Sequence, residues 1–258
     1  MNEREDLNFV EILGVKVTNI NEIILNQEIN KICQNAGKEI ITNVNINAMN
    51  LAHSNVWFKD FLNDAYINFC DGDGVRLGAK ILGHKIYNKI TYNRWIWNLA
   101  EYSQAEGLSW FLIGSEDRVI NKAFQILKIK YPKLRIEGYR NGYFNDEFEI
   151  GEISKILKKV KPNILVLGMG MPIQEKFLAK YYPQLTFNVA LTGGAVFDYV
   201  SGEAKMTPDI YYRLKLEWFY RFLNEPRRLF IRYFLGNPMF IFRIFLEKFK
   251  IKRYLFVT

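Results

Sequence analysis

The sequence has little cysteine and no long uninterrupted apolar run. Its two cysteines, Cys33 and Cys70, show neither CxxC nor Cys/His spacing, which excludes a disulfide scaffold and a structural zinc site. No apolar run reaches the roughly 18 residues that cross a bilayer, so we expect no transmembrane helix. The opening MNEREDLNF is charged and lacks the apolar segment of a signal peptide. We therefore expect a cytoplasmic protein with reduced thiols.

The positive charge is concentrated in the tail. The chain of 258 residues has a net charge of +8, and residues 203–258 hold 12 of its Lys and Arg against 5 Asp and Glu. The same tail holds 15 of the 40 aromatic residues. Such a tail favours an anionic partner, either a phospholipid surface or nucleic acid. Interleaved aromatic and basic residues are typical of an interfacial amphipathic helix, and the alternative is an ordinary helical layer on the sheet.

Strand, turn and helix patterns alternate along residues 1–202. Examples are the buried strand in GLSWFLIGSED, followed by the helical pattern RVINKAFQILKIKYP. This alternation predicts an α/β fold with a Rossmann-like, mostly parallel sheet and helices on both faces. Residues 203–258 form a predicted C-terminal basic helical appendage, which we expect Pro226 and Gly236-Asn237-Pro238 to break into about three helices.

Polar and glycine-rich turns follow the predicted strands. In a parallel sheet these turns meet at one edge, where ligands bind. Asp71 opens the turn DGDG and could act as a base, although Asp-Gly is also a common turn dipeptide. The turn 168–176 could bind phosphate through backbone N–H groups or could be a plain βα connection; it matches neither GxGxxG nor a P-loop, and an oxidoreductase is not indicated.

Three alternating asparagines, Asn43, Asn45 and Asn47, fall on one face if the segment is extended. Their amides could bind sugar hydroxyls or uracil, or an asparagine could cap the following helix. Lys89 and Thr91 could neutralise phosphate, although a lone lysine is usually a solvated surface charge. The two histidines have no sequence partner that indicates a metal pair, and we interpret both as structural or surface residues.

Five segments, by their order and spacing, resemble the WecG/TagA/CpsF family of glycosyltransferases. The resemblance runs from about Ile12 to Phe245. The segments are DGDGVRLGAKILG (71–83), FLIGS (111–115), ILVLGMGMPIQEKF (164–177), GGAVFDYVSG (193–202) and EWFYRFLNEPRRLFIRYFLGNP (217–238).

The resemblance implies an inverting transfer of N-acetylmannosamine, or a related sugar, from a UDP-sugar to an undecaprenyl-diphosphate-linked acceptor. It implies that Asp71 is the catalytic base and that Gln174 lies near the sugar or diphosphate. Asn45 matches the asparagine of the family's Thr-x-Asn motif, whereas the threonine is replaced by Asn43. The family often has Arg where Lys89 stands, and Lys lacks the bidentate fork of Arg.

The site expected from the residues and the resemblance joins both parts of the chain. By resemblance, the appendage arginines close over the site and touch the membrane or the diphosphate. The predicted catalytic residue is Asp71, and the predicted substrate-binding residues are Asn43, Asn45, Lys89, Thr91, Gly114, Gly168, Gly170, Gln174, Gly194, Arg221, Arg227 and Arg228.

The family is metal-independent, and we expect no metal or cofactor, although Asp71-Gly-Asp73 has a spacing that could hold Mg²⁺. The expected location is peripheral, on the inner face of the cell membrane. Expected partners are the UDP-sugar, the lipid-linked acceptor and an anionic membrane surface, without nucleic acid; a homo-oligomer is left open. The alternatives are a basic RNA-binding α/β protein and an inactive assembly scaffold.

Overall fold

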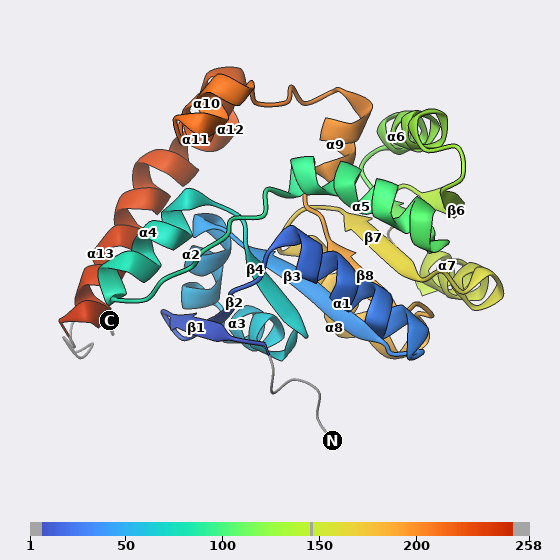
Figure 1. Cartoon of the computed structure of the whole chain (residues 1–258), viewed down its shortest axis with the longest axis horizontal. Helices are drawn as coiled ribbons and strands as arrows, with labels where there is room; N and C mark the ends of the chain where they lie inside the picture. The colour runs from blue at the N-terminus through green and yellow to red at the C-terminus, as the bar shows by residue number, and fades with distance from the viewer. Residues whose placement is uncertain (1–6, 145–146, 250–258) are drawn as a thin grey trace.

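One eight-stranded sheet forms the centre of the computed structural model, which describes residues 7–144 and 147–249. The strand order is β1-β2-β4-β3-β8-β7-β5-β6, and each pairing is parallel except that of β1 with β2. The predicted fold class is confirmed (Figure 1). The strands are β1 Phe9–Ile12, β2 Val15–Thr18, β3 Glu39–Val44, β4 Ile67–Cys70, β5 Ser109–Gly114, β6 Arg135–Arg140, β7 Ile164–Gly168 and β8 Val189–Thr192.

Helices cover both faces of the sheet, which explains why β7 is apolar along its whole length. Ile164 and Val166 pack in one buried cluster with side chains of α1, α5, α6 and α9. Leu165 and Leu167 face the opposite way, into a cluster with side chains of α7 and α8. These helices are α1 Glu22–Gln34, α5 Tyr92–Glu106, α6 Asp117–Lys130, α7 Glu147–Val160, α8 Ile173–Tyr181 and α9 Val196–Ser201, and a 3₁₀ turn η2 spans Tyr182–Gln184.

The tail shares a core with the sheet domain. Phe240 and Ile244 are fully buried in a cluster that also contains Val44 of β3 and Val75 of α4. The tail therefore packs on the side of the fold formed by α2 Ile46–Ser54, α3 Val56–Asp64 and α4 Asp73–Leu82. Its elements are α10 Asp209–Arg213, α11 Glu217–Asn224, α12 Pro226–Ile231, η3 Arg232–Gly236 and α13 Asn237–Lys248. Residues 250–258 of the predicted appendage lie outside the described residues.

The expected break at Gly236-Asn237-Pro238 is wrong. A π-helical turn, η3, joins α12 to α13, so the chain stays helical from Pro226 to Lys248. A π-turn accommodates an irregularity within a helix without ending it. The expected break at Pro226 is confirmed, since this proline occupies the first turn of α12, where its missing N–H costs no hydrogen bond.

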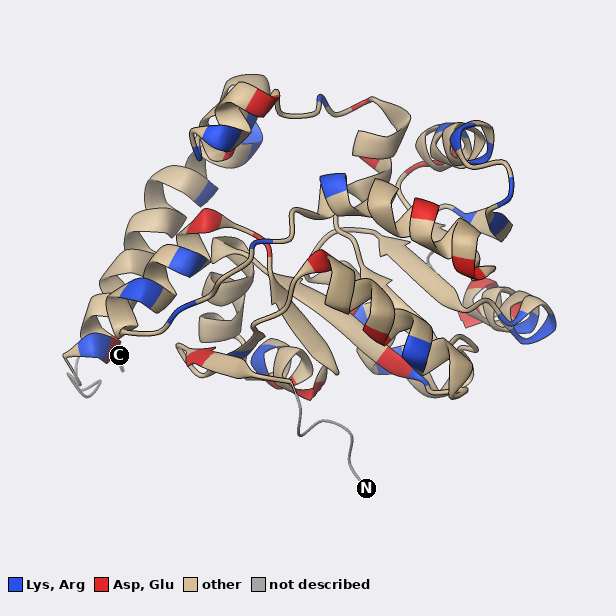
Figure 2. Ribbon diagram, in the orientation of Figure 1, with Lys and Arg blue, Asp and Glu red and all other residues tan. Residues whose placement is uncertain are grey.

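The continuous helix is also long and apolar enough to cross a membrane, by length and composition alone, although the sequence led us to expect no transmembrane helix. It spans 23 residues with a mean hydropathy of 1.4 over its most apolar window, and 17% of that window is buried. Our expectation required an uninterrupted apolar run, but Arg232 and Arg243 interrupt the run and turn toward the protein, where they donate to Asn45 and Asn50. In Figure 2 the ribbon of α13 is tan over most of its length.

Candidate active site

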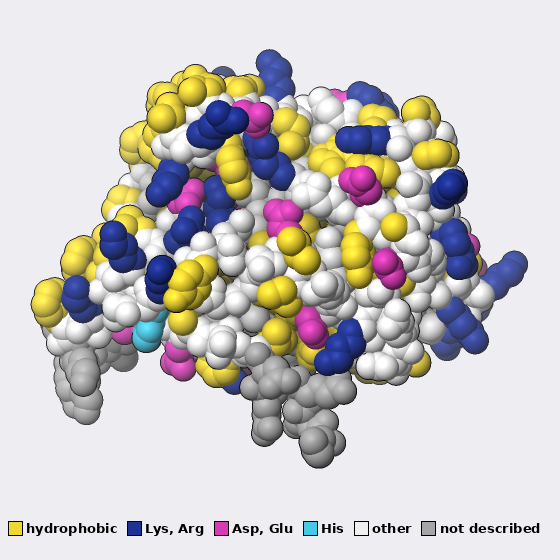
Figure 3. All heavy atoms as spheres, in the orientation of Figure 1, with side chains coloured by type: hydrophobic (Ala, Val, Ile, Leu, Met, Phe, Trp, Pro, Cys, Tyr) yellow, Lys and Arg dark blue, Asp and Glu magenta, His cyan; other side chains and the backbone are white. Residues whose placement is uncertain are grey.

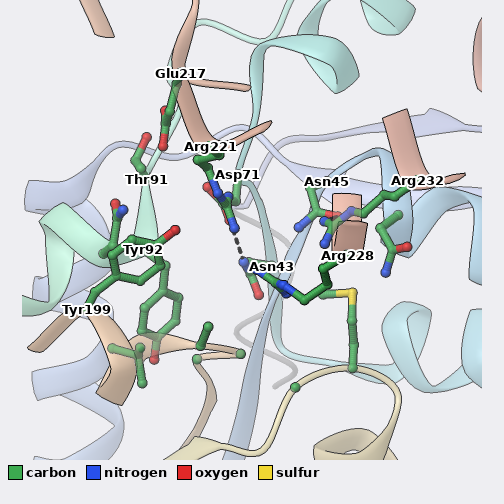
Figure 4. A pocket seen from close by; sticks show the side chains of 18 residues that line it. Asn43, Asn45, Asp71, Thr91, Tyr92, Tyr199, Glu217, Arg221, Arg228 and Arg232 are labelled. Atoms are coloured by element: carbon green, nitrogen blue, oxygen red, sulfur yellow. Dashed lines mark hydrogen bonds between the residues drawn. The ribbon is translucent and has the colours of Figure 1, made fainter. Parts of the chain in front are cut away.

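A pocket opens at the carboxyl ends of the central parallel strands, and the tail forms its opposite wall (Figure 4). The segments after β3, β4, β7 and β8 contribute one side, and α11, α12 and η3 contribute the other. The lining residues are Asn43, Asn45, Asn47, Asp71, Thr91, Tyr92, Asn93, Gly170, Met171, Gly193, Gly194, Ala195, Val196, Tyr199, Glu217, Arg221, Arg228 and Arg232.

Asp71 is a half-buried carboxylate on the sheet side of the pocket. It directly follows β4, and its backbone N–H donates to the carbonyl of Val44 at 2.8 Å. Burial raises its pKa to about 6, and the negative charge of Glu217 adds to the increase; Arg221, Lys89 and a hydrogen bond from Asn43 oppose it. A carboxylate with such a pKa is a proton acceptor at neutral pH and holds a proton more firmly than an ordinary aspartate.

The three alternating asparagines all line this pocket. Asn43 Nδ2 donates to Asp71 Oδ2 at 3.0 Å and so orients the carboxylate (Figure 4). Asn45 caps α2, where its Oδ1 accepts the N–H of Ala48 at 3.2 Å and a second hydrogen bond from Arg232 at 3.2 Å. The helix-cap alternative is therefore confirmed for Asn45, and the same side chain also joins the sheet to the tail.

The start of α5 presents buried polar atoms without partners in the described chain. They are Thr91 Oγ1, Tyr92 Oη and Asn93 Oδ1, and all three residues line the pocket. A buried polar group that lacks a hydrogen bond costs about 1–3 kcal/mol. A ligand rich in hydroxyl or amide groups would supply the missing partners.

The tail contributes cations to the opposite wall. Arg221 is largely enclosed, and its Nε also has no hydrogen-bond partner in the described chain. Arg228 pairs with Glu225 at the rim, and Arg232 donates to Asn45. Arginine forks bind phosphate oxygens in a bidentate way, so this wall suits a diphosphate.

Gln174 lies behind the pocket wall and supports it. It is fully buried and does not line the cavity. Its Oε1 accepts the N–H of Gly194 at 3.0 Å, and its Nε2 donates to Glu175 Oε1 at 2.8 Å. Burial raises the pKa of Glu175 to about 7. Gln174 therefore fixes the Gly193–Gly194 turn of the pocket wall, and its side chain does not itself line the pocket in which we expected it.

Lys89 is engaged by acidic groups and lies outside the lining. Its Nζ contacts Asp73 Oδ2 at 2.8 Å and Glu217 Oε2 at 3.5 Å, and it lies over the ring of Tyr212. Asp73 also pairs with Arg76 at 3.3 Å. The second carboxylate of the Asp71-Gly-Asp73 spacing is therefore bound by cations of the protein.

Two predicted glycines serve chain packing. Gly114 has a φ of +152°, and a Cβ there would lie 2.3 Å from the carbonyl oxygen of Gly168. A Cβ on Gly168 would lie 2.4 Å from the ring of Phe197. These close approaches explain why both positions are glycine. Neither glycine lines the pocket, and the predicted Arg227 does not line it either. The other predicted residues that line the pocket, beyond those described above, are Gly170 and Gly194.

Comparison with known proteins identifies the kind of enzyme. A model of the glycosyl transferase WecG/TagA/CpsF family matches residues 10–254. The chain belongs to this glycosyltransferase family. It is similar to the N-acetylglucosaminyldiphosphoundecaprenol N-acetyl-β-D-mannosaminyltransferases of Bacillus spizizenii and Staphylococcus aureus (strain MW2). The first is 29% identical and covers 81% of this chain and 79% of its own length; the second is 26% identical and covers 97% and 98%.

Sequence reasoning missed several residues that line this pocket. Tyr92 and Asn93 directly follow the predicted Thr91, so their position at the start of the same helix, α5, was the available signal. Arg232 lies one helical turn beyond the predicted Arg228, and no break was expected between them, so helical spacing was the available signal. Glu217 and Tyr199 carry no local signal, because only the fold of the tail over the sheet brings them to the pocket.

Proposed function

We propose that the protein transfers N-acetylmannosamine, or a related hexosamine or hexuronic acid, from a UDP-sugar to an undecaprenyl-diphosphate-linked sugar. The observation that carries the proposal is the group of unpartnered buried atoms on Thr91, Tyr92, Asn93 and Arg221 around the half-buried Asp71. Hydroxyl and amide partners suit a sugar, and the arginine suits a phosphate. The names of the similar enzymes specify this sugar and this acceptor.

The proposed chemistry is a single displacement with inversion. The acceptor hydroxyl attacks the anomeric carbon of the donor while Asp71 takes the hydroxyl proton. The bond from the anomeric carbon to the phosphate oxygen breaks, and UDP leaves with the electron pair. Arg221, Arg228 and Arg232 compensate the charge that develops on the leaving diphosphate.

We propose that this compensation needs no metal ion. Asp73, the second carboxylate that could hold Mg²⁺, is already bound by Arg76 and Lys89. Turnover should therefore continue in EDTA. Loss of turnover in EDTA that Mg²⁺ restores would contradict this part of the proposal.

We further propose that the protein is peripheral on the inner face of the membrane, with the tail at the lipid surface. Exposed apolar side chains gather over α10–α13, with Lys and Arg beside them (Figure 3). Rings at headgroup depth and cations on anionic lipid suit an interfacial helix. The full chain should bind phosphatidylglycerol vesicles, bind phosphatidylcholine vesicles less, and leave the membrane in alkaline carbonate. Retention in carbonate would favour a spanning helix instead.

The direct test of the transfer is a UDP-release screen. A panel of UDP-sugars would be offered with a short-chain prenyl-diphosphate-linked N-acetylglucosamine, and the product would be examined by mass spectrometry and by NMR of its anomeric carbon. We expect UDP release that requires the acceptor, strongest with UDP-N-acetylmannosamine, and a β-linked product. No release with any donor, or release that is independent of the acceptor, would contradict the proposal.

A further inference from the structure

A second cavity lies on the outer side of the tail. It has a volume of about 570 Å³ and runs between Trp218 of α11 and the continuous tail helix. Aromatic and aliphatic side chains form most of its lining, among them Tyr233, Phe234, Ile241, Phe242 and Phe245. Grooves of this size lined by apolar groups are typical of sites for apolar ligands.

The groove is a continuous stripe along one flank of the helix. Phe234, Ile241 and Phe245 follow at intervals of seven and four residues, which places them on one side of a helix. From Phe234 to Phe245 the stripe extends roughly 17 Å at ~1.5 Å per residue. The arginines within this part of the tail, Arg232 and Arg243, donate to Asn45 and Asn50, and no charged side chain of the described chain lines the groove.

The groove adjoins the polar pocket. Glu217 and Arg232 line the pocket, and their direct neighbours Trp218 and Tyr233 line the groove. The rings of Trp218 and Tyr233 lie edge to face, with centroids 6.0 Å apart. The two tail elements α11 and η3 thus lie between the arginine side of the pocket and the aromatic lining of the groove.

Electrostatics link Tyr233, which lines the groove, to Arg221, which lines the pocket. Burial lowers the pKa of Arg221, but the phenols of Tyr199 and Tyr233, with Asp71 and Glu217, raise it overall. Tyr233 is therefore close enough to the pocket arginine to affect its pKa, and the same residue lines the groove. A tyrosine has a polar hydroxyl and an apolar ring, so Tyr233 suits the point where an anionic head group would meet an apolar chain.

We propose that the groove binds the isoprenoid chain of the lipid-linked acceptor, with the acceptor diphosphate at the pocket arginines. This inference rests on the proposed function, because that function supplies an acceptor with an anionic head and an apolar chain. The occupant must reach both cavities at once, which a detached fatty acid or a purely apolar ligand does not do. The groove gives the chain a path from the pocket toward the apolar surface of α10–α13.

The test compares acceptors that differ only in chain length. N-acetylglucosamine diphosphate carrying a geranyl or a geranylgeranyl chain would be offered, below the critical micelle concentration and without membranes, to wild type, Phe242→Ala and Leu235→Ala. Phe242 lines the groove and is 52% exposed; Leu235, 65% exposed, lies outside it on the same helix. Both side chains are exposed enough for truncation to leave the fold intact, and circular dichroism would verify this.

We expect wild type to show a lower KM for the geranylgeranyl acceptor. Phe242→Ala should raise that KM roughly tenfold, from lost apolar burial, with the KM for the UDP-sugar unchanged. Leu235→Ala should behave as wild type. Equal KM values for the geranyl and geranylgeranyl acceptors in wild type would contradict chain binding in the groove and leave the proposed transfer reaction intact.

Equal losses in both variants would overturn it in favour of general contact between the tail and lipid. A chain-length effect that vanishes on dilution of the enzyme would overturn it in favour of a chain site formed between two copies of the protein. Failure of wild type to use either acceptor with any UDP-sugar would instead contradict the proposed function.

Discussion

The two walls of the pocket differ in chemistry and in origin. The sheet wall carries amides, hydroxyls and one carboxylate. Its asparagines and Asp71 stand at the ends of parallel strands, and Thr91, Tyr92 and Asn93 stand at the start of α5. The tail wall carries arginines on helices whose outer side is largely apolar and exposed. This difference is the basis of our proposal that the sheet side binds the sugar and removes the proton and that the tail side binds the diphosphate and the lipid.

The largest expected effect lies on the sheet wall. Asp71→Asn removes the proton acceptor at nearly constant shape, so kcat should fall by roughly 10²–10⁴. Binding of UDP, measured by calorimetry, should be kept because the tail arginines are intact. A kcat near that of wild type would show that Asp71 is not the base.

The next effect lies on the tail wall, where adjacent arginines provide a matched pair. Arg228 lines the pocket and Arg227 does not. Arg228→Ala should lower kcat/KM by about 10² through lost compensation of the leaving diphosphate, whereas Arg227→Ala should cost far less. Steady-state UDP release measures both. Equal losses would mean that charge over the whole tail matters and that the pocket geometry does not.

The contact between the walls should appear in the pH profile. Glu217 of the tail raises the pKa of Asp71, second to burial. Glu217→Gln removes that charge, so the pKa of Asp71 should fall from about 6 and the acid limb of kcat/KM should move to lower pH. An acid limb that is unchanged or moves to higher pH would show that Glu217 does not raise the pKa of the catalytic base.

The smallest expected effect concerns an unpartnered hydroxyl. Thr91→Val should lower kcat/KM about fivefold to tenfold and leave the melting temperature nearly unchanged, because Thr91 Oγ1 has no partner in the described chain. Thr192→Val is the matched control, since Thr192 Oγ1 is also buried and unpartnered but does not line the pocket. Equal activity losses in the two variants would remove Thr91 from the ligand site.

The sheet wall was largely predictable from the sequence, because parallel strands bring their carboxyl ends to one edge. That rule alone placed Asp71 and the alternating asparagines together. It did not separate glycines that border the pocket from glycines that allow close packing, since Gly114 and Gly170 give similar turn signals. The difference depends on what a Cβ would meet: backbone of Gly168 at Gly114, and nothing within 4 Å at Gly170.

The tail wall was predictable in composition but not in arrangement. Its charge and aromatic content were evident, whereas the positions of Glu217 and Arg232 depend on contacts with Lys89 and Asn45, far away in the sequence. Lys89 shows the same limit. A lysine in the loop before α5 resembles a phosphate ligand until the fold brings Glu217 and Asp73 to it.

The most direct measurement of the central claim, that the tail completes a metal-free transferase site on the sheet, is transfer in EDTA by wild type and by Arg221→Ala. Product would be detected by mass spectrometry with UDP-N-acetylmannosamine and the prenyl-diphosphate-linked acceptor. The account predicts full transfer by wild type in EDTA and a loss in Arg221→Ala that added Mg²⁺ does not repair. Transfer by wild type that stops in EDTA, or an Arg221→Ala enzyme as active as wild type, would contradict it.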